Sequence, residues 1–188
     1  KIRIKEKKNK KIQITFIGRL NKIKNIETQI YLLERLVKQT KKYHLNIIGP
    51  DDGSLNNIKK IVDNLNLKKN VSFFKPIYGD KKYTIIKETD IMILTSFYEC
   101  NSILAIETMA LGGVLLCTTN CNLDHAAKYG AVKMSNYDIN SLVKSVKYLS
   151  IKKNSKLIRK KALKYAKKNL DIQINMKKII NFYKEIIN

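Results

Sequence analysis

The chain has few of the residues that build disulfide frameworks or metal sites. Its 188 residues include three cysteines and two histidines. Cys100, Cys117 and Cys121 are odd in number and lack framework spacing, which indicates a reduced, cytosolic protein. Cys117 and Cys121 could share a metal only with His44 or His125, so we expect no metal site.

Long apolar segments and internal repeats are also missing. No apolar run approaches the ~18 to 20 residues of a membrane-spanning helix, and no signal-peptide pattern opens the chain. Residues 1–10 are basic and are interpreted as an exposed lead-in. The first residue is Lys rather than Met, so we expect a fragment or a processed chain. Neither a repeat nor a linker divides the rest, and residues 11–188 are predicted to form one domain that includes the C-terminal helices.

Acidic residues and arginine are scarce as well. Thirty-eight Lys and Arg face fifteen Asp and Glu, which gives a net charge of +23, yet the arginines are only Arg3, Arg19, Arg35 and Arg159. Proteins that read bases favour the planar guanidinium, so we expect no specific nucleic-acid partner. The alternative that the charge leaves open is a non-catalytic lysine-rich module that binds nucleic acid or an anionic membrane.

What the sequence does contain is a regular alternation of strand and helix patterns. Apolar, β-branched strands are predicted at 11–17, 45–48, 71–74, 91–94, 114–117 and 131–133. Helical spacing of apolar residues covers 25–42, 55–65, 78–87, 102–111, 124–129 and most of 138–188. Buried strands joined by helices predict an α/β fold, a doubly wound, Rossmann-like parallel sheet of about six strands with helices on both faces. In such a sheet ligands bind at the carboxyl ends of the strands.

The loop after the fourth strand carries the clearest candidate site. Glu99 lies in this loop and Glu107 lies in the following helix, for which Asn101 or Ser102 is the expected N-cap. A helix N-terminus binds phosphate through its free backbone amides. Two carboxylates beside a phosphate cradle suit a ligand with hydroxyls and a diphosphate, which describes a nucleotide sugar.

The loop after the first strand offers the opposite charge. Gly18 would allow the backbone to approach a ligand closely, and Arg19 and Lys24 could neutralise a diphosphate, with Lys22 as a competitor of Lys24. Such a clamp would stabilise the charge on a leaving nucleoside diphosphate.

Six segments in this order resemble the C-terminal, donor-binding domain of retaining glycosyltransferases of the GT-B fold, particularly family 4. The resemblance covers residues 11–188, and its segments are Gly18–Arg19–Leu20 with Lys24, Ile48–Gly49–Pro50, Asn70–Val71–Ser72–Phe73, Asp90–Ile91, Ser96 through Gly112 with the two glutamates eight apart, and Tyr129–Gly130–Ala131–Val132.

The resemblance implies a metal-independent, retaining hexosyltransferase that needs no cofactor and uses a sugar donor of the UDP or GDP type. The acceptor would be a glycan or a lipid-linked molecule, and an N-terminal acceptor domain missing from this chain would complete the enzyme, so the chain alone is expected to be inactive. A cytoplasmic location, with peripheral attachment to the inner membrane face through the basic surface, would suit such an acceptor.

The resemblance also assigns roles to individual residues. Arg19, Lys24 and Glu99 would be catalytic, the first two at the diphosphate and Glu99 at the hydroxyls of the donor sugar. The remaining donor-binding residues would be Gly18, Pro76, Ile77, Asn101, Ser102, Ile103 and Glu107, with Glu107 at the ribose hydroxyls and 75–77 at the base edge.

The sequence departs from the family pattern within these same segments. Cys100 and Asn25 stand where the family usually has glycine, and Lys75 replaces the glycine expected after the third strand. Val114 replaces a common proline, and only Asp124 could correspond to the glutamate after the fifth strand. These departures affect the identity of the donor sugar more than the fold.

Overall fold

The structure is a computed structural model that describes residues 11–187, so the predicted lead-in at 1–10 lies outside the described residues. Six strands are formed: β1 Ile12–Ile17, β2 Tyr43–Ile48, β3 Val71–Phe74, β4 Ile91–Leu94, β5 Leu115–Thr118 and β6 Lys133–Ser135. The helices are α1 Ile26–Gln39, α2 Leu55–Asn64, α3 Gly79–Glu88, α4 Ile103–Ala110, α5 Asp124–Tyr129, α6 Ile139–Ser150, α7 Lys152–Asn169 and α8 Ile172–Ile187, with short 3-10 turns η1 Lys22–Lys24 and η2 Thr119–Cys121.

All six strands pair in parallel in the order β3-β2-β1-β4-β5-β6. The chain therefore builds outward from β1 to β3 and then crosses back to continue from β4 on the other side of β1. Every residue of β4 and β5 is buried, which agrees with their uninterrupted apolar sequences. The predicted doubly wound, Rossmann-like sheet is confirmed, and the reversal of strand order lies between β1 and β4.

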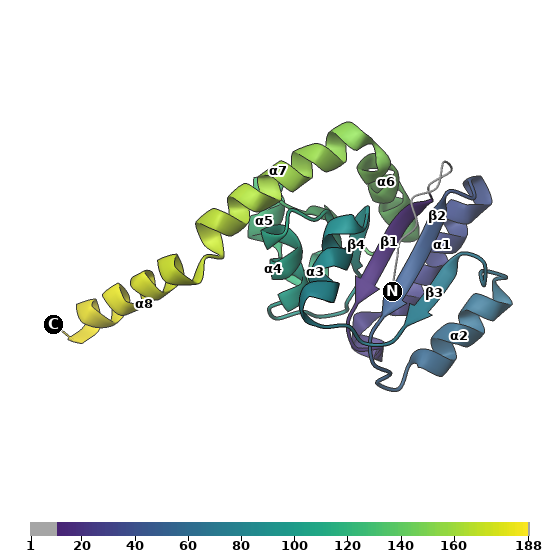
Figure 1. Ribbon diagram of the computed structural model, residues 1–188, viewed down its shortest axis with the longest axis horizontal. Coiled ribbons are helices and arrows are strands. Elements are labelled where there is room, and N and C mark those ends of the chain that lie inside the picture. The colour runs from purple at the N-terminus through teal and green to yellow at the C-terminus, as the bar shows by residue number, and fades with distance from the viewer. Residues whose placement is uncertain (1–10, 188) are drawn as a thin grey trace.

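Helices cover both faces of the sheet (Figure 1). Helices α1, α2 and α6 pack together on one face, and α3, α4, α5 and α7 pack together on the other. Right-handed crossovers explain this division, because reversing the direction of strand addition after β3 moves the connecting helices to the opposite face.

The sixth strand begins two residues later than predicted, at residue 133 instead of residue 131. Ala131 and Val132 are buried, as their apolar character suggested, but strand pairing starts at Lys133, opposite Leu116 of β5. The two apolar residues instead close the turn that follows Gly130, which has a left-handed backbone at φ 79°. At this position the buried apolar residues are therefore not the residues that pair in the sheet.

The C-terminal region is helical, as predicted, and ends in a helix that stands apart. Helix α8 extends away from the sheet (Figure 1), and none of its described residues is buried. Its exposed apolar side chains include Met176, Ile179, Tyr183 and Ile186, which recur at helical spacing. Within residues 11–187 no helix combines the length and apolar character needed to cross a bilayer.

Candidate functional site

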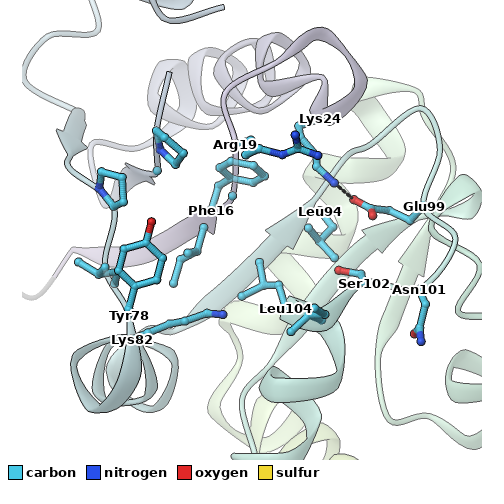
Figure 2. A pocket seen from close by; sticks show the side chains of 17 residues that line it. Phe16, Arg19, Lys24, Tyr78, Lys82, Leu94, Glu99, Asn101, Ser102 and Leu104 are labelled. Atoms are coloured by element: carbon cyan, nitrogen blue, oxygen red, sulfur yellow. Dashed lines mark hydrogen bonds and ion pairs between the residues drawn. The ribbon is translucent and has the colours of Figure 1, made fainter. Parts of the chain in front are cut away.

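A cavity of about 410 Å³ lies at the point where the strand order reverses. Its walls come from the loops after β1, β2, β3 and β4 and from the first turn of α4 (Figure 2). Nine of the ten predicted site residues line it: Gly18, Arg19, Lys24, Pro76, Ile77, Glu99, Asn101, Ser102 and Ile103. Lys22, the competitor of Lys24, is not among the lining residues. The volume lies within the range of small-molecule sites.

Hydrogen bonds fix the β1 and β4 loops to each other at the cavity. The backbone N–H of Phe97 donates to the carbonyl of Ile23 at 2.8 Å, and the Thr95 hydroxyl donates to the carbonyl of Asn25 at 2.9 Å. Asn25 has a left-handed backbone at φ 47° and is buried. Asn tolerates this conformation better than other residues with a Cβ, which explains how it can stand where the family usually has glycine.

Lys24 and Glu99 form an ion pair on one side of the cavity. Lys24 Nζ lies 2.7 Å from Glu99 Oε1, and their side chains are 22% and 9% exposed. The same carboxylate oxygen accepts a hydrogen bond from the Ser96 hydroxyl at 2.7 Å. The turn that presents Lys24 is held by Asn21, whose side-chain oxygen accepts from the Lys24 N–H. Two residues 75 positions apart in sequence are therefore brought together as predicted from their loops.

Arg19 lies on the same side of the cavity but is held less firmly (Figure 2). Its guanidinium is 3.7 Å from Asp52, and its side chain is 70% exposed. An exposed ion pair of this kind contributes little to stability, so Arg19 can turn toward an anion at a small cost in free energy.

The N-terminus of α4 forms another wall. Ser102 is its N-cap and accepts a hydrogen bond from the N–H of Ala105, which confirms one of the two predicted caps. The amides of Ile103 and Leu104 in the first turn have no intrahelical acceptor, so they can bind an anion in the cavity.

Glu107 does not line the cavity itself, although its partner does. Glu107 Oε2 lies 2.5 Å from Nζ of Lys82, a lining residue on α3, and the two side chains are 20% and 19% exposed. The sequence reasoning missed Lys82, because a lysine on a polar helix is a solvent-exposed residue by default. Its position one turn after the β3 loop was the only available signal.

Glycine is required at Gly49, where β2 ends against the loop after β1. A Cβ built on Gly49 would lie 1.8 Å from the carbonyl oxygen of Gly18. The close approach is therefore between two backbone segments of the cavity wall.

Tyr137, from the loop between β6 and α6, contacts the loop that follows β4. Its hydroxyl donates to the backbone carbonyl of Ser96, and its ring stacks on Phe97 with centroids 6.0 Å apart. Burial raises the pKa of Tyr137, so its hydroxyl remains a donor even at pH values well above neutral. Sequence reasoning missed this residue because nothing local relates it to a loop 41 positions earlier.

Within residues 11–187 no group of three His, Cys, Asp or Glu is arranged to hold a metal ion. Burial raises the pKa of the Cys117 and Cys121 thiols, so both stay protonated and would be poor metal ligands.

The strand order and the cavity at its switch point define a Rossmann-like domain whose cavity is lined by Arg19, Lys24 and Lys82 and by the N-terminus of α4. The chain belongs to the family described as glycosyl transferases group 1, which matches residues 1–169.

One curated relative and two solved structures are similar to this chain. An uncharacterized glycosyltransferase of Methanocaldococcus jannaschii is 28% identical over 100 residues, which cover 53% of this chain and 25% of that protein. The sucrose-phosphate synthase of Thermosynechococcus elongatus has a TM-score of 0.82 at 18% identity, covering 95% of this chain and 46% of the other. HepE of Anabaena, solved in complex with UDP and glucose, has a TM-score of 0.82 at 14% identity, and the match covers 93% of this chain and 48% of HepE. The chain thus spans less than half the length of these relatives, and its fold is one half of a GT-B fold.

Proposed function

We propose that this chain is the donor-binding domain of a retaining glycosyltransferase that moves a hexose-type sugar from a nucleoside diphosphate to a glycan or lipid-linked acceptor. The observation that carries the proposal is the Lys24–Glu99 ion pair beside the free N-terminus of α4 in one cavity. A cation, free amides and a carboxylate match the phosphates and hydroxyls of a nucleotide sugar. The complex of HepE with UDP and glucose is a precedent for the ligand class in a protein of this fold.

In the proposed reaction, the bond between the anomeric carbon and the diphosphate oxygen breaks and the leaving diphosphate gains negative charge. Arg19 and Lys24 stabilise this charge together with the first-turn amides of α4, a case of electrostatic preorganisation. Glu99 accepts hydrogen bonds from hydroxyls of the transferred sugar. The acceptor hydroxyl attaches on the face that the leaving group occupied, and its proton passes to the departing diphosphate. The cations take the role that a divalent ion has in other enzymes.

The acceptor half of the site would come from a second, N-terminal domain. The chain spans less than half the length of its relatives, which leaves room for such a domain. The exposed apolar side chains of α8 would pack against it. We therefore expect this chain to bind donor but to turn it over poorly or not at all.

The test is calorimetric titration of the chain with UDP, GDP, ADP and their sugar conjugates. We expect at least one to bind with a Kd below about 1 mM, and Lys24→Met to weaken it about tenfold or more, as loss of a hydrogen bond to a charged group does. Lys60→Met, at an exposed lysine of α2, is the matched control. Absence of binding by every nucleotide near millimolar concentration would refute the proposal. Binding that weakens steeply with salt and equally in both variants would favour the polyanion-binding alternative.

A further inference from the structure

Glu99, the carboxylate proposed to bind the transferred sugar, is held in place by neighbouring side chains. The loop that carries it follows β4 and begins with Thr95 and Ser96, which are completely buried. The Ser96 hydroxyl donates to Glu99 Oε1 at 2.7 Å, and Lys24 Nζ lies 2.7 Å from the same oxygen. These two contacts fix the direction of the carboxylate and leave its other oxygen, Oε2, to accept a hydrogen bond from a ligand.

Tyr137 holds the backbone of Ser96. It comes from the loop between β6 and α6, and its hydroxyl donates to the carbonyl of Ser96 and lies 3.2 Å from the carbonyl of Thr95. Its ring stacks on Phe97 with the ring planes 10° apart. Because Thr95 and Ser96 are buried, water cannot easily replace a lost donor at their carbonyls, and the position of Ser96 therefore depends on the tyrosine hydroxyl.

The other side of the same loop is anchored independently of Tyr137. Asn120, in the turn η2 after β5, donates from its side chain to the carbonyl of Phe97 at 3.0 Å. The carbonyl of Asn120 accepts from the N–H of Glu99 at 3.2 Å. Loss of the tyrosine hydroxyl alone should therefore leave the path of the loop intact and change the orientation of Ser96 and of the Glu99 carboxylate that it contacts.

We infer that Tyr137 is a positioning residue for the donor sugar, because it sets the orientation of Glu99 through Ser96. The inference rests on the proposed function, in which Glu99 accepts from hydroxyls of the sugar. It predicts that Tyr137 affects the binding of the sugar more than that of the nucleoside diphosphate. The proposed phosphate ligands Arg19 and Lys24 belong to the loop after β1, and Glu99 keeps its charge when Tyr137 is replaced.

The test is calorimetric and compares free UDP and GDP with UDP-glucose, UDP-galactose and GDP-mannose. The measured quantity is the Kd of the free diphosphate divided by the Kd of its sugar conjugate. In Tyr137→Phe, which keeps the ring that stacks on Phe97, this ratio should fall about 3- to 10-fold, the effect of one lost hydrogen bond. The Kd of the free diphosphate should change less than about twofold. Tyr148→Phe, at an exposed tyrosine of α6, is the matched control and should leave the ratio unchanged.

A double variant tests whether Tyr137 acts through Ser96. Ser96→Ala removes the hydroxyl that donates to Glu99 and should by itself lower the ratio by a similar factor. If the two residues act in series, the double variant Tyr137→Phe with Ser96→Ala should lower the ratio no further than the stronger of the two single variants. Fully additive effects would overturn the inference, because they would give Tyr137 and Ser96 independent roles.

The remaining outcomes separate this inference from the proposed function. An unchanged ratio in Tyr137→Phe, or equal weakening of diphosphate and conjugate, would overturn the inference and leave the proposed function standing. Binding of free diphosphate but of no conjugate by the unmodified chain would also overturn the inference. Failure of the unmodified chain to bind any of these nucleotides would overturn both. Thermal unfolding of each variant, with Tm expected within about 4 °C of the unmodified chain, shows that the fold is retained.

Discussion

Replacing Glu99 by Gln should strengthen the binding of a nucleoside diphosphate that carries no sugar. Lys24 Nζ lies 2.7 Å from Glu99 Oε1, a gross attraction of about 6 kcal/mol at an effective dielectric constant of 20. Desolvation of the two poorly exposed groups offsets most of it, leaving about 1 to 2 kcal/mol. An incoming diphosphate has to compete with Glu99 for this lysine. Removing the competing charge should therefore raise the affinity for UDP or GDP about 5- to 30-fold.

The same substitution should reduce what the sugar adds to binding. Glu99 is the proposed acceptor for sugar hydroxyls, and Gln accepts a weaker, uncharged hydrogen bond. The ratio between the Kd of the free diphosphate and that of its sugar conjugate should fall about tenfold. Calorimetry with both ligands measures the two effects, and Glu88→Gln, at an exposed carboxylate of α3, is the control. A Glu99→Gln chain that binds free diphosphate no better than the unmodified chain would refute the competition between carboxylate and ligand.

Three further predictions concern stability. Gly49→Ala should lower the free energy of unfolding by about 3 kcal/mol or more, because the new Cβ would meet the Gly18 carbonyl oxygen at 1.8 Å. Gly53→Ala, with φ 88° and open space around it, should cost only about 1 kcal/mol in denaturant titrations. Arg159→Met removes guanidinium hydrogen bonds of 2.9 and 3.0 Å to carbonyls that follow α4 and α3, and should lower Tm by about 4 to 16 °C. Burial, aided by the charge of Lys11, lowers the pKa of His44 below 6.5. As pH drops below about 6.5 the unfolded chain therefore takes up a proton before the folded chain does, and the free energy of unfolding should fall by at most ~1.4 kcal/mol per pH unit. His44→Gln should flatten this part of the plot of unfolding free energy against pH.

The residues that sequence analysis placed correctly are those whose position follows from one strand and its own loop. Arg19 and Lys24 follow β1, and Glu99 follows β4, so the parallel sheet alone brings them to one edge. Ser102 could be predicted as a cap from its side chain and the apolar helix behind it. These positions depend on local chemistry and one topological rule.

The residues that sequence analysis missed depend on how distant elements pack. Lys82 reaches Glu107 only because α3 packs against α4. Tyr137 reaches Ser96 only because the loop between β6 and α6 contacts the loop that follows β4. Neither contact leaves a periodic pattern or a motif in the sequence. Side-chain partners between separate crossovers require the three-dimensional packing, which composition and periodicity do not contain.

The large positive charge of the chain is not what shapes the cavity. Two of the three cations that line it, Lys24 and Lys82, face carboxylates within 2.7 Å, and only Arg19 is loosely paired. By contrast α7 carries nine lysines and arginines and no acidic residue, so a polyanion would collect along that helix rather than in the cavity. A ligand that binds in the cavity would instead exchange partners with the Lys24–Glu99 pair, offering negative charge to Lys24 and a hydroxyl to Glu99. A nucleotide sugar can offer both groups, whereas a simple phosphate offers no sugar hydroxyl to replace Lys24 at Glu99.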